Sequence, residues 1–319
     1  MGPGPDQLPI AVRFARPGRL PEPRTLYGRV AVLDLAFDGA APEQALRWLD
    51  QLGSRLAVWI DHHDQPLWEH LRGRPDMHLV PRSQAPACPP LVTAAIVASH
   101  GPVDTLVAHG DLDGVLSAAK WMLLAEGREA PGWLDPDGIA ADTRKGVLTA
   151  RGERLDRALR ASTGRERLRR AVVASVLAEV RGEEEHAEVR TLLDRALAAH
   201  EGARRNADAA RETAEPLHDL EQDVVLVDLR RFGAERRLDL TELMLPLQRR
   251  FDWVVVFAHG AQGRLKVVVS TDPARSGLDL RREFGLHGFA PFRVHVPAAV
   301  LLGRLPSARL REALGAEAG

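Results

Sequence analysis

Cysteine is nearly absent from this chain of 319 residues, in which Cys88 is the single example. One cysteine excludes an internal disulfide bond and a cluster of thiolate metal ligands. Aromatic residues make up only 5% of the sequence, and Phe284, Phe289 and Phe292 are the candidates for stacking against bases. Proteins that hold long single strands use several such stacking side chains. The composition therefore argues against a binder of long single-stranded nucleic acid.

An excess of either charge is also missing, because 43 Lys and Arg residues stand against 44 Asp and Glu residues, a formal net charge of -1. A binder of long duplexes is expected to carry a basic excess. A short anionic ligand held by a few local arginines is compatible with this balance.

Long apolar runs are lacking as well. No uninterrupted stretch approaches the ~20 residues that span a bilayer, and the N-terminus lacks the charged start and apolar core of a secretion signal. We expect a cytoplasmic protein with no membrane partner. The oligomeric state stays open, with a homodimer as one alternative.

The first half shows apolar strands alternating with amphipathic helices, in a chain that is 45% hydrophobic and long enough for two domains. After an N-terminal tail over residues 1–26, this pattern fills residues 27–150. Predicted strands cover 29–37, 55–60 and 104–109, and predicted helices cover 41–52, 89–99 and 114–127. The spacing predicts an α/β fold with a doubly wound parallel sheet, whose ligands bind at the carboxyl ends of the strands.

The second half begins with residues 151–216, which are rich in Arg, Glu and Ala at helical spacing. They predict a helical region whose late part is a connector. A second, smaller α/β domain is predicted over 217–319. The segments that carry its pattern are 223–229, 241–251, 253–260, 263–271, 279–285 and 292–296.

Acidic and histidine side chains follow the predicted strands of the first domain. They are Asp34 and Asp38, then Asp61, His62 and His63, then His109, Asp111 and Asp113, with Asp142 in a fourth, less regular turn. Parallel strand ends converge on one edge, so these groups can share one cleft. A lone aspartate there is usually a helix N-cap, but four carboxylates together repel one another, and divalent cations remove that repulsion. The set predicts two cations. Carboxylate and imidazole ligands suit Mn²⁺, with Mg²⁺, Co²⁺ or Zn²⁺ as alternatives.

Four stretches make this pattern specific: "VLDLAFD" (32–38), "IDHH" (60–63), "HGDLDG" (109–114) and "GIAADTRKG" (138–146). They resemble the four motifs of the DHH phosphoesterase superfamily, which contains RecJ-type exonucleases, nanoRNases, cyclic-dinucleotide phosphodiesterases and inorganic pyrophosphatases. The region from 223 to about 296 is similar to the DHH-associated substrate-binding domain. The resemblance covers nearly the whole chain outside the tail and the helical middle.

The resemblance implies a role for each residue that matches a motif. His109 and Asp111 would hold one cation, Asp113, His62 and Asp142 would hold the other, and Asp34 would bridge both. His63 would contact the phosphate or donate a proton near the leaving group, and Asp61 would orient the histidines. In the second domain, the implied substrate contacts are Arg275, Gly285, His287 and Gly288.

Two departures from the family pattern bear on these roles. The family places its DxD motif before DHH, whereas "HGDLDG" follows "DHH" here, which leaves Asp135 and Asp137 as alternatives to Asp142. The family also carries a glycine-rich run ending in histidine, of which "EFGLHGFAPF" (283–292) keeps only part. The usual oligonucleotide substrate therefore does not follow automatically.

The expected function is a metal-dependent phosphodiesterase that cleaves short single-stranded oligonucleotides or linear or cyclic dinucleotides. The alternative is a non-catalytic nucleotide-binding sensor or assembly subunit that retains the fold. An inorganic pyrophosphatase is less compatible, because the family's pyrophosphatases lack this kind of C-terminal domain. A serine or cysteine hydrolase lacks support, since the sequence has no G-x-S-x-G motif.

Overall fold

The structure is a computed structural model of the whole chain, and it describes all residues except 39–40, 162–165, 233–236, 261–263, 288–289 and 316–319. The chain divides into two compact units, Met1–Ala199 and His200–Gly319. Both are α/β, as the sequence predicts. Each unit is described by itself below.

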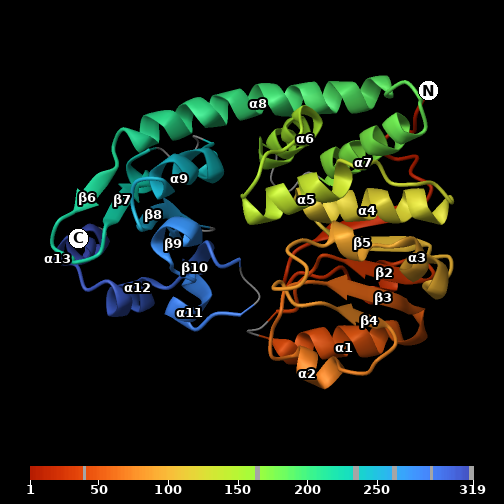
Figure 1. Cartoon of the computed structure of the whole chain (residues 1–319), viewed down its shortest axis with the longest axis horizontal. Helices are drawn as coiled ribbons and strands as arrows, with labels where there is room; N and C mark the ends of the chain where they lie inside the picture. Colours follow the sequence, from red (N-terminus) through yellow and green to blue (C-terminus); the bar gives the residue numbers. More distant parts are fainter. Residues whose placement is uncertain (39–40, 162–165, 233–236, 261–263, 288–289, 316–319) are drawn as a thin grey trace. The chain divides into compact units, whose positions relative to one another are not determined.

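A five-stranded, fully parallel sheet organises the first unit (Figure 1). Its strand order is β1-β5-β2-β3-β4. The strands are β1 (Ala11–Ala15), β2 (Val30–Leu33), β3 (Leu56–Asp61), β4 (Met77–Leu79) and β5 (Thr105–His109). The chain runs outward from β2 through β3 to β4 and then returns to place β5 on the other side of β2. This reversal makes the carboxyl end of β2 the position where an open α/β sheet binds its ligand.

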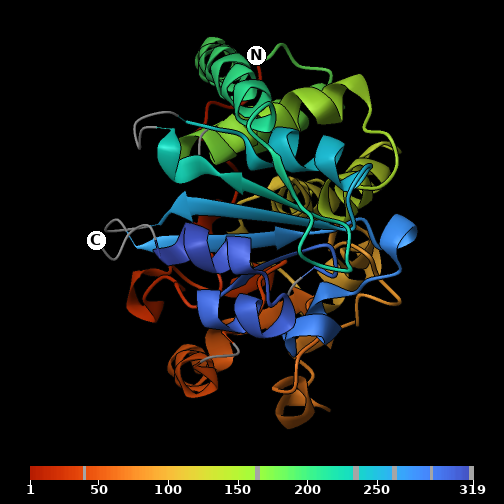
Figure 2. The same ribbon diagram turned by 90° about the vertical axis from the view of Figure 1, so that its left-hand side faces the viewer.

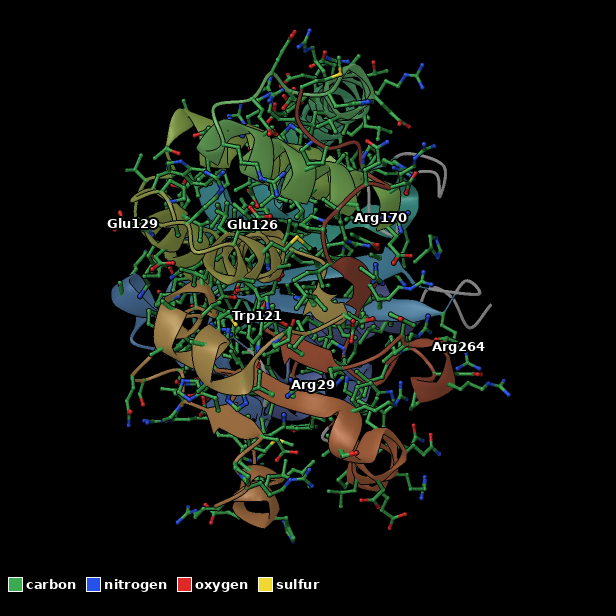
Figure 3. All side chains as sticks on the ribbon, turned by 90° about the vertical axis from the view of Figure 1, so that its right-hand side faces the viewer. Arg29, Trp121, Glu126, Glu129, Arg170 and Arg264 are labelled. Atoms are coloured by element: carbon green, nitrogen blue, oxygen red, sulfur yellow. The ribbon has the colours of Figure 1, made fainter. Side chains whose placement is uncertain are left out.

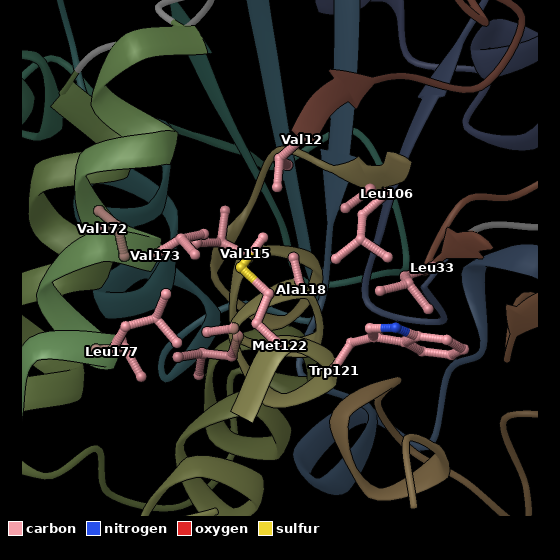
Figure 4. Close-up of a cluster of buried hydrophobic side chains, with 14 of the residues drawn as sticks. Val12, Leu33, Leu106, Val115, Ala118, Trp121, Met122, Val172, Val173 and Leu177 are labelled. Carbon is pink, nitrogen blue, oxygen red and sulfur yellow. The ribbon is translucent and has the colours of Figure 1, made fainter. Parts of the chain in front are cut away.

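Helices cover both faces of this sheet, so the doubly wound prediction is confirmed. The helices are α1 (Pro42–Leu52), α2 (Trp68–Leu71), α3 (Ala94–His100), α4 (Leu112–Ala125), α5 (Leu134–Thr143), α6 (Ala150–Ala161) and α7 (Glu166–Val180), with short 3-10 turns at Pro23–Thr25, Gly53–Arg55 and Pro89–Leu91. Apolar residues of α1 and α2 pack on one face. Those of α3 to α7 pack on the other, where Trp121 and Met122 of α4 lie between the sheet and α7 (Figure 4). Buried apolar area of this extent is the main source of stability.

The unit is larger than the predicted domain at both ends. Residues 1–26, predicted as a tail, contain β1, which pairs with β5 from Ala11↔Thr105 to Ala15↔His109. Beyond residue 150, the apolar sides of α6 and α7 belong to the same core as α4. The Arg- and Glu-rich sequence conceals this, because α7 is charged at its start but buried almost throughout residues 171–178.

The second unit holds a mixed five-stranded sheet of order β10-β9-β8-β7-β6. Its strands are β6 (Glu215–Leu217), β7 (Val224–Asp228), β8 (Trp253–His259), β9 (Leu265–Ser270) and β10 (Arg293–Val296). Its helices are α9 (Leu240–Gln248), α10 (Pro273–Ser276), α11 (Leu280–Phe284), α12 (Ala298–Arg304) and α13 (Ala308–Gly315), with a 3-10 turn at Leu229–Arg231. In Figure 2 the cyan α9 and the blue α12 and α13 lie on opposite sides of the strands, which matches two separate apolar clusters.

The helix α8 (Ala187–Arg211) contributes to the cores of both units. Val189, Leu193 and Ala196 belong to the first core, and Ala207 and Ala210 belong to the second. Among the described residues, no helix is both long and apolar enough to cross a membrane.

Trp59 of β3 fixes the segment that follows β2. Its side chain is fully buried, its Nε1 donates a hydrogen bond to the carbonyl of Leu35 at 2.9 Å, and its ring stacks on Phe37 with centroids 4.2 Å apart. The chain just after Asp34 is therefore held by one aromatic side chain from the neighbouring strand.

We predict that Trp59→Ala lowers the free energy of unfolding by about 3–5 kcal/mol, because it leaves a large cavity. Trp59→Phe keeps most of the packing but leaves the Leu35 carbonyl without its donor, at a cost of about 1–3 kcal/mol. Urea unfolding of the full chain measures both values. A loss under 1 kcal/mol for Trp59→Ala would contradict this role.

Candidate metal centre

Asp34 lies at the centre of the site, one residue after the end of β2 and between the ends of β3 and β5. Its φ is +57°, a left-handed conformation that Asp tolerates better than most residues. Its backbone N–H donates to the carbonyl of Ile60 at 2.9 Å, and its side chain is 1% exposed. A strained, buried acid at a strand end is a common feature of functional sites.

A first group of potential metal ligands joins Asp34 to the end of β5. One ligand atom from each of Asp34, His109 and Asp111 lies within 4.8 Å of the others. Nδ1 of His109 is 2.7 Å from a carboxylate oxygen of Asp111 and 3.8 Å from Oδ2 of Asp34. Burial, the largest single influence, would lower the pKa of His109, but the charge and hydrogen bond of Asp111, together with the charge of Asp142, raise the pKa overall. Burial would raise the pKa of Asp111, but the charge and hydrogen bond of His109 help to lower it.

A second group, also with ligand atoms within 4.8 Å, consists of His62, Asp113 and Asp142. Nδ1 of His62 lies 3.1 Å from the carbonyl of Ala85, and Nε2 lies 3.1 Å from Oδ1 of Asp34. When Nδ1 donates to that carbonyl, Nε2 presents its lone pair to the carboxylates, which is how an imidazole ligand is commonly oriented. Burial, and next the charge of Arg82, lowers the pKa of His62 and favours this neutral form.

His63 has a different environment. Its Nδ1 lies 2.7 Å from Oδ1 of Asp61, and its side chain is 15% exposed, whereas Asp61 is fully buried. Burial would raise the pKa of Asp61, but His63 lowers it through charge and this hydrogen bond. With Nδ1 held by Asp61, the other ring nitrogen of His63 is left for proton exchange.

The excess of buried carboxylates is the main electrostatic feature of the site. Burial, followed by the charges of Asp111 and other acids, raises the pKa of Asp34 and of Asp113 well above the ordinary range. Among the described residues, Oδ2 of Asp34 and Oδ2 of Asp113 have no hydrogen-bond partner although both are buried. Unpaired carboxylate oxygens next to a neutral imidazole fit divalent cations, which prefer such ligands and remove the repulsion.

Arg82, in the loop after β4, belongs to the site and was missed by the sequence analysis. Its guanidinium group donates to Asp142 and to the carbonyl of Pro86 at 3.4 Å, and its side chain is 9% exposed. Burial alone would lower its pKa, but Asp142, and then Asp113, raises it. No motif marks this arginine, because only the fold brings its loop to the acids.

The prediction that the fourth motif forms a turn is wrong. Asp142 lies in the last turn of the helix α5. Helical packing of Gly138 to Ala141 against the core explains the difference. Of the three alternative acids, Asp142 is the one that lies next to other potential ligands, His62 and Asp113. Asp135 accepts hydrogen bonds from Nζ of Lys120 at 2.7 and 2.8 Å, and Asp137 accepts from the backbone of Thr149 at 2.8 Å.

Gly114 shows why the turn after β5 is so tight. A Cβ atom there would lie 2.6 Å from the carbonyl oxygen of His109, so α4 starts against the end of the strand only with glycine at this position. Asp38, the other acid predicted after β2, is not in these groups of the described residues and instead approaches Gly18.

The residues predicted to contact substrate in the second unit are placed as follows. Arg275 is engaged by carboxylates, pairing with Asp252 and, at 3.2 Å, with Asp223. Gly285 ends α11 with a φ of +62°, and His287 is exposed. Gly288 lies outside the described residues.

The second unit also holds a group of possible metal ligands, whose closeness follows from the capping of α9. One atom each from His200, Asp239 and Glu242 lies within 4.8 Å of the others. Asp239 caps α9 by accepting from the backbone N–H groups of Thr241 and Glu242, and its other oxygen lies 3.1 Å from Nε2 of His200. This contact ties α8 to the start of α9.

Comparisons with known proteins show a likeness to solved structures. No family model and no curated protein matches the sequence. A solved structure described as "pGpG-specific phosphodiesterase - PggH from Vibrio cholrae" matches with probability 1.00 and a TM-score of 0.44. The identity is 12%, and the match covers 90% of this chain and 99% of that chain. At this identity and TM-score, the likeness supports no transfer of activity.

We predict that Mn²⁺ stabilises the protein. A ligand at 100 times its Kd adds about 2.7 kcal/mol, which corresponds to a Tm increase of roughly 5–10 °C for a unit of this size. Asp113→Asn should remove most of this increase. Thermal unfolding of EDTA-treated protein, with and without Mn²⁺, tests both statements, and an equal increase in the variant would contradict the ligand assignment.

The raised pKa of Asp113 also predicts a pH effect in the metal-free protein. A carboxyl group with a raised folded-state pKa contributes stability below its unfolded pKa and loses it as pH rises through the folded value. Metal-free Asp113→Asn should therefore melt above the parent protein at pH 7.5, and the difference should shrink towards pH 4.5. A lower Tm for the variant at both pH values would contradict the electrostatic argument.

Proposed function

We propose that the protein is a metal-dependent phosphodiesterase that hydrolyses short oligonucleotides or linear or cyclic dinucleotides. The observation that carries the proposal is the pair of ligand groups, Asp34 with His109 and Asp111, and His62 with Asp113 and Asp142, at one sheet edge. Two adjacent cation sites built from carboxylates and imidazoles suit phosphoryl transfer to water. The resemblance of the four motifs to the DHH superfamily supports the same reaction class.

Two divalent cations, Mn²⁺ or alternatively Mg²⁺ or Co²⁺, are proposed for these groups. When bound there, they supply positive charge that stabilises phosphoryl oxygens and acidifies water. Asp34 faces both groups, and Asp111 and Asp113 flank it from the start of α4. These carboxylates would hold the cations and offset their charge, while neutral His62 would complete the second group.

The histidine His63 is proposed to move a proton at its free ring nitrogen, close to the leaving oxygen. Asp61 holds Nδ1 of His63 at 2.7 Å and stabilises the imidazolium that forms when the ring carries a second proton. Arg82 adds a guanidinium group beside Asp142, where it contributes a positive charge to the phosphate environment. Arg275, Gly285, His287 and Gly288 are proposed as the contacts of the second unit with substrate.

We predict that Asp111→Ala and His62→Ala each abolish hydrolysis while leaving the fold intact. The assay is Mn²⁺-dependent cleavage of a panel containing pApA, a short RNA, cyclic dinucleotides, pyrophosphate and bis-p-nitrophenyl phosphate, with EDTA as a second control. Glu43→Gln, which removes a charge from an exposed residue of α1, should leave hydrolysis unchanged. Metal binding without turnover of any substrate would favour a nucleotide sensor instead.

The role of His63 is tested by the leaving group. His63→Gln should lower kcat for a dinucleotide by about 10²–10⁴-fold, because the departing sugar oxygen needs a proton. The same variant should lose much less activity on bis-p-nitrophenyl phosphate, whose leaving group departs as an anion. Equal losses on the two substrates would exclude proton donation.

A further inference from the structure

Arg169 of α7 packs against the backbone of the first ligand group. Its Nε donates to the carbonyl of Gly110 at 2.8 Å, between His109 and Asp111. A Cβ atom on Gly110 would lie 2.3 Å from that nitrogen and 2.5 Å from Cζ, so only glycine admits the guanidinium group here. The group also lies over the ring of Phe14, 5.9 Å from its centroid.

A second arginine reaches the same place from β1. The last residue of β1, Ala15, is paired with His109, so Arg16 leaves the sheet beside Gly110. Side chains alternate along a strand, which puts Phe14 and Arg16 on one face, the face that Arg169 covers. The chain then turns sharply, with the N–H of Arg19 donating to the carbonyl of Arg16 at 2.9 Å.

These two guanidinium groups lack the acidic partners that neighbouring arginines have. In the same helix, Arg170, which is labelled in Figure 3, pairs with Asp6 at 3.0 Å, and Arg167 pairs with Glu188. Among the described residues, no carboxylate lies within ion-pair distance of Arg16 or Arg169. Burial, and next the charge of Arg16, lowers the pKa of Arg169, with Asp111 and Glu166 acting in the opposite sense.

Two like charges placed together favour an anionic ligand, and the planar donor fork of arginine matches phosphate oxygens. We propose that Arg16 and Arg169 form a subsite for the terminal phosphate monoester of a linear substrate, next to the site of cleavage. This inference rests on the proposed function and narrows its substrate. A terminal monoester carries a charge of about -1.5 to -2 at pH 7 and is absent from cyclic dinucleotides.

The experiment compares pApA, ApA and cyclic di-AMP as substrates of the full-length protein with Mn²⁺. The parent protein should prefer pApA over ApA by roughly tenfold to a hundredfold in kcat/KM, the range expected for charge-assisted hydrogen bonds. Arg16→Gln and Arg169→Gln should each remove part of this preference, so that kcat/KM falls more for pApA than for ApA. Arg47→Gln, an equal change of charge on an exposed residue of α1, is the matched control.

A binding measurement separates this inference from the proposed function. Calorimetry with pApA carrying a non-hydrolysable internal linkage should show weaker binding to both variants than to the parent protein. Arginine-dependent binding without turnover of any substrate would sink the proposed function but retain the subsite. Turnover with no preference for pApA would overturn the subsite. An equal loss of activity on pApA and ApA in Arg169→Gln, with no effect of Arg16→Gln, would also overturn it and would make Arg169 a positioning residue for Gly110.

Discussion

Like-charge repulsion among the carboxylates at one sheet edge is the constraint on which the rest of the candidate site depends. The parallel sheet forces this repulsion, because the ends of β2, β3 and β5 lie side by side. The two large apolar clusters of the first unit hold the strands in register and prevent the acids from moving apart. The fold thus stores an unfavourable interaction that a bound divalent cation would relieve, and this would link stability to metal binding.

Three histidines at this edge illustrate how partners decide protonation. His62 lies against a backbone carbonyl and Arg82, so burial keeps it neutral. His109 lies against Asp111, which favours its charged form in the absence of a cation. His63 shares Asp61 and is the most suited to exchange a proton. The groups next to each ring therefore suit identical side chains to the different roles proposed for them, metal ligand or acid–base group.

The placement of the arginines explains how a protein of nearly zero net charge could bind the anionic substrates proposed for it. Many of its arginines pair with acids on their own or adjacent helices, such as Arg157 with Glu153. Arg82 also pairs with an acid, but that acid is Asp142 of the candidate site, whereas Arg169 donates to the carbonyl of Gly110. The nearly neutral net charge thus conceals local positive charge. Burial strengthens the electrostatic interactions of such a guanidinium group, because a charge partly removed from water is screened less.

The sequence by itself determined the two α/β patterns and the motif residues at the strand ends, because hydrophobic periodicity and the position of acids after apolar runs are local properties. It missed β1, which lies in the segment interpreted as an N-terminal tail, and β4, which has only three residues. It also placed Asp142 in a turn, although the residue lies in α5. It offered no sign of Arg82 or of the contact between Arg169 and Gly110. These depend on segments 59 or more residues apart that meet only when the core closes. Only the tertiary structure brings Asp142 next to His62 and Asp113, while Asp135 and Asp137 are engaged by Lys120 and Thr149.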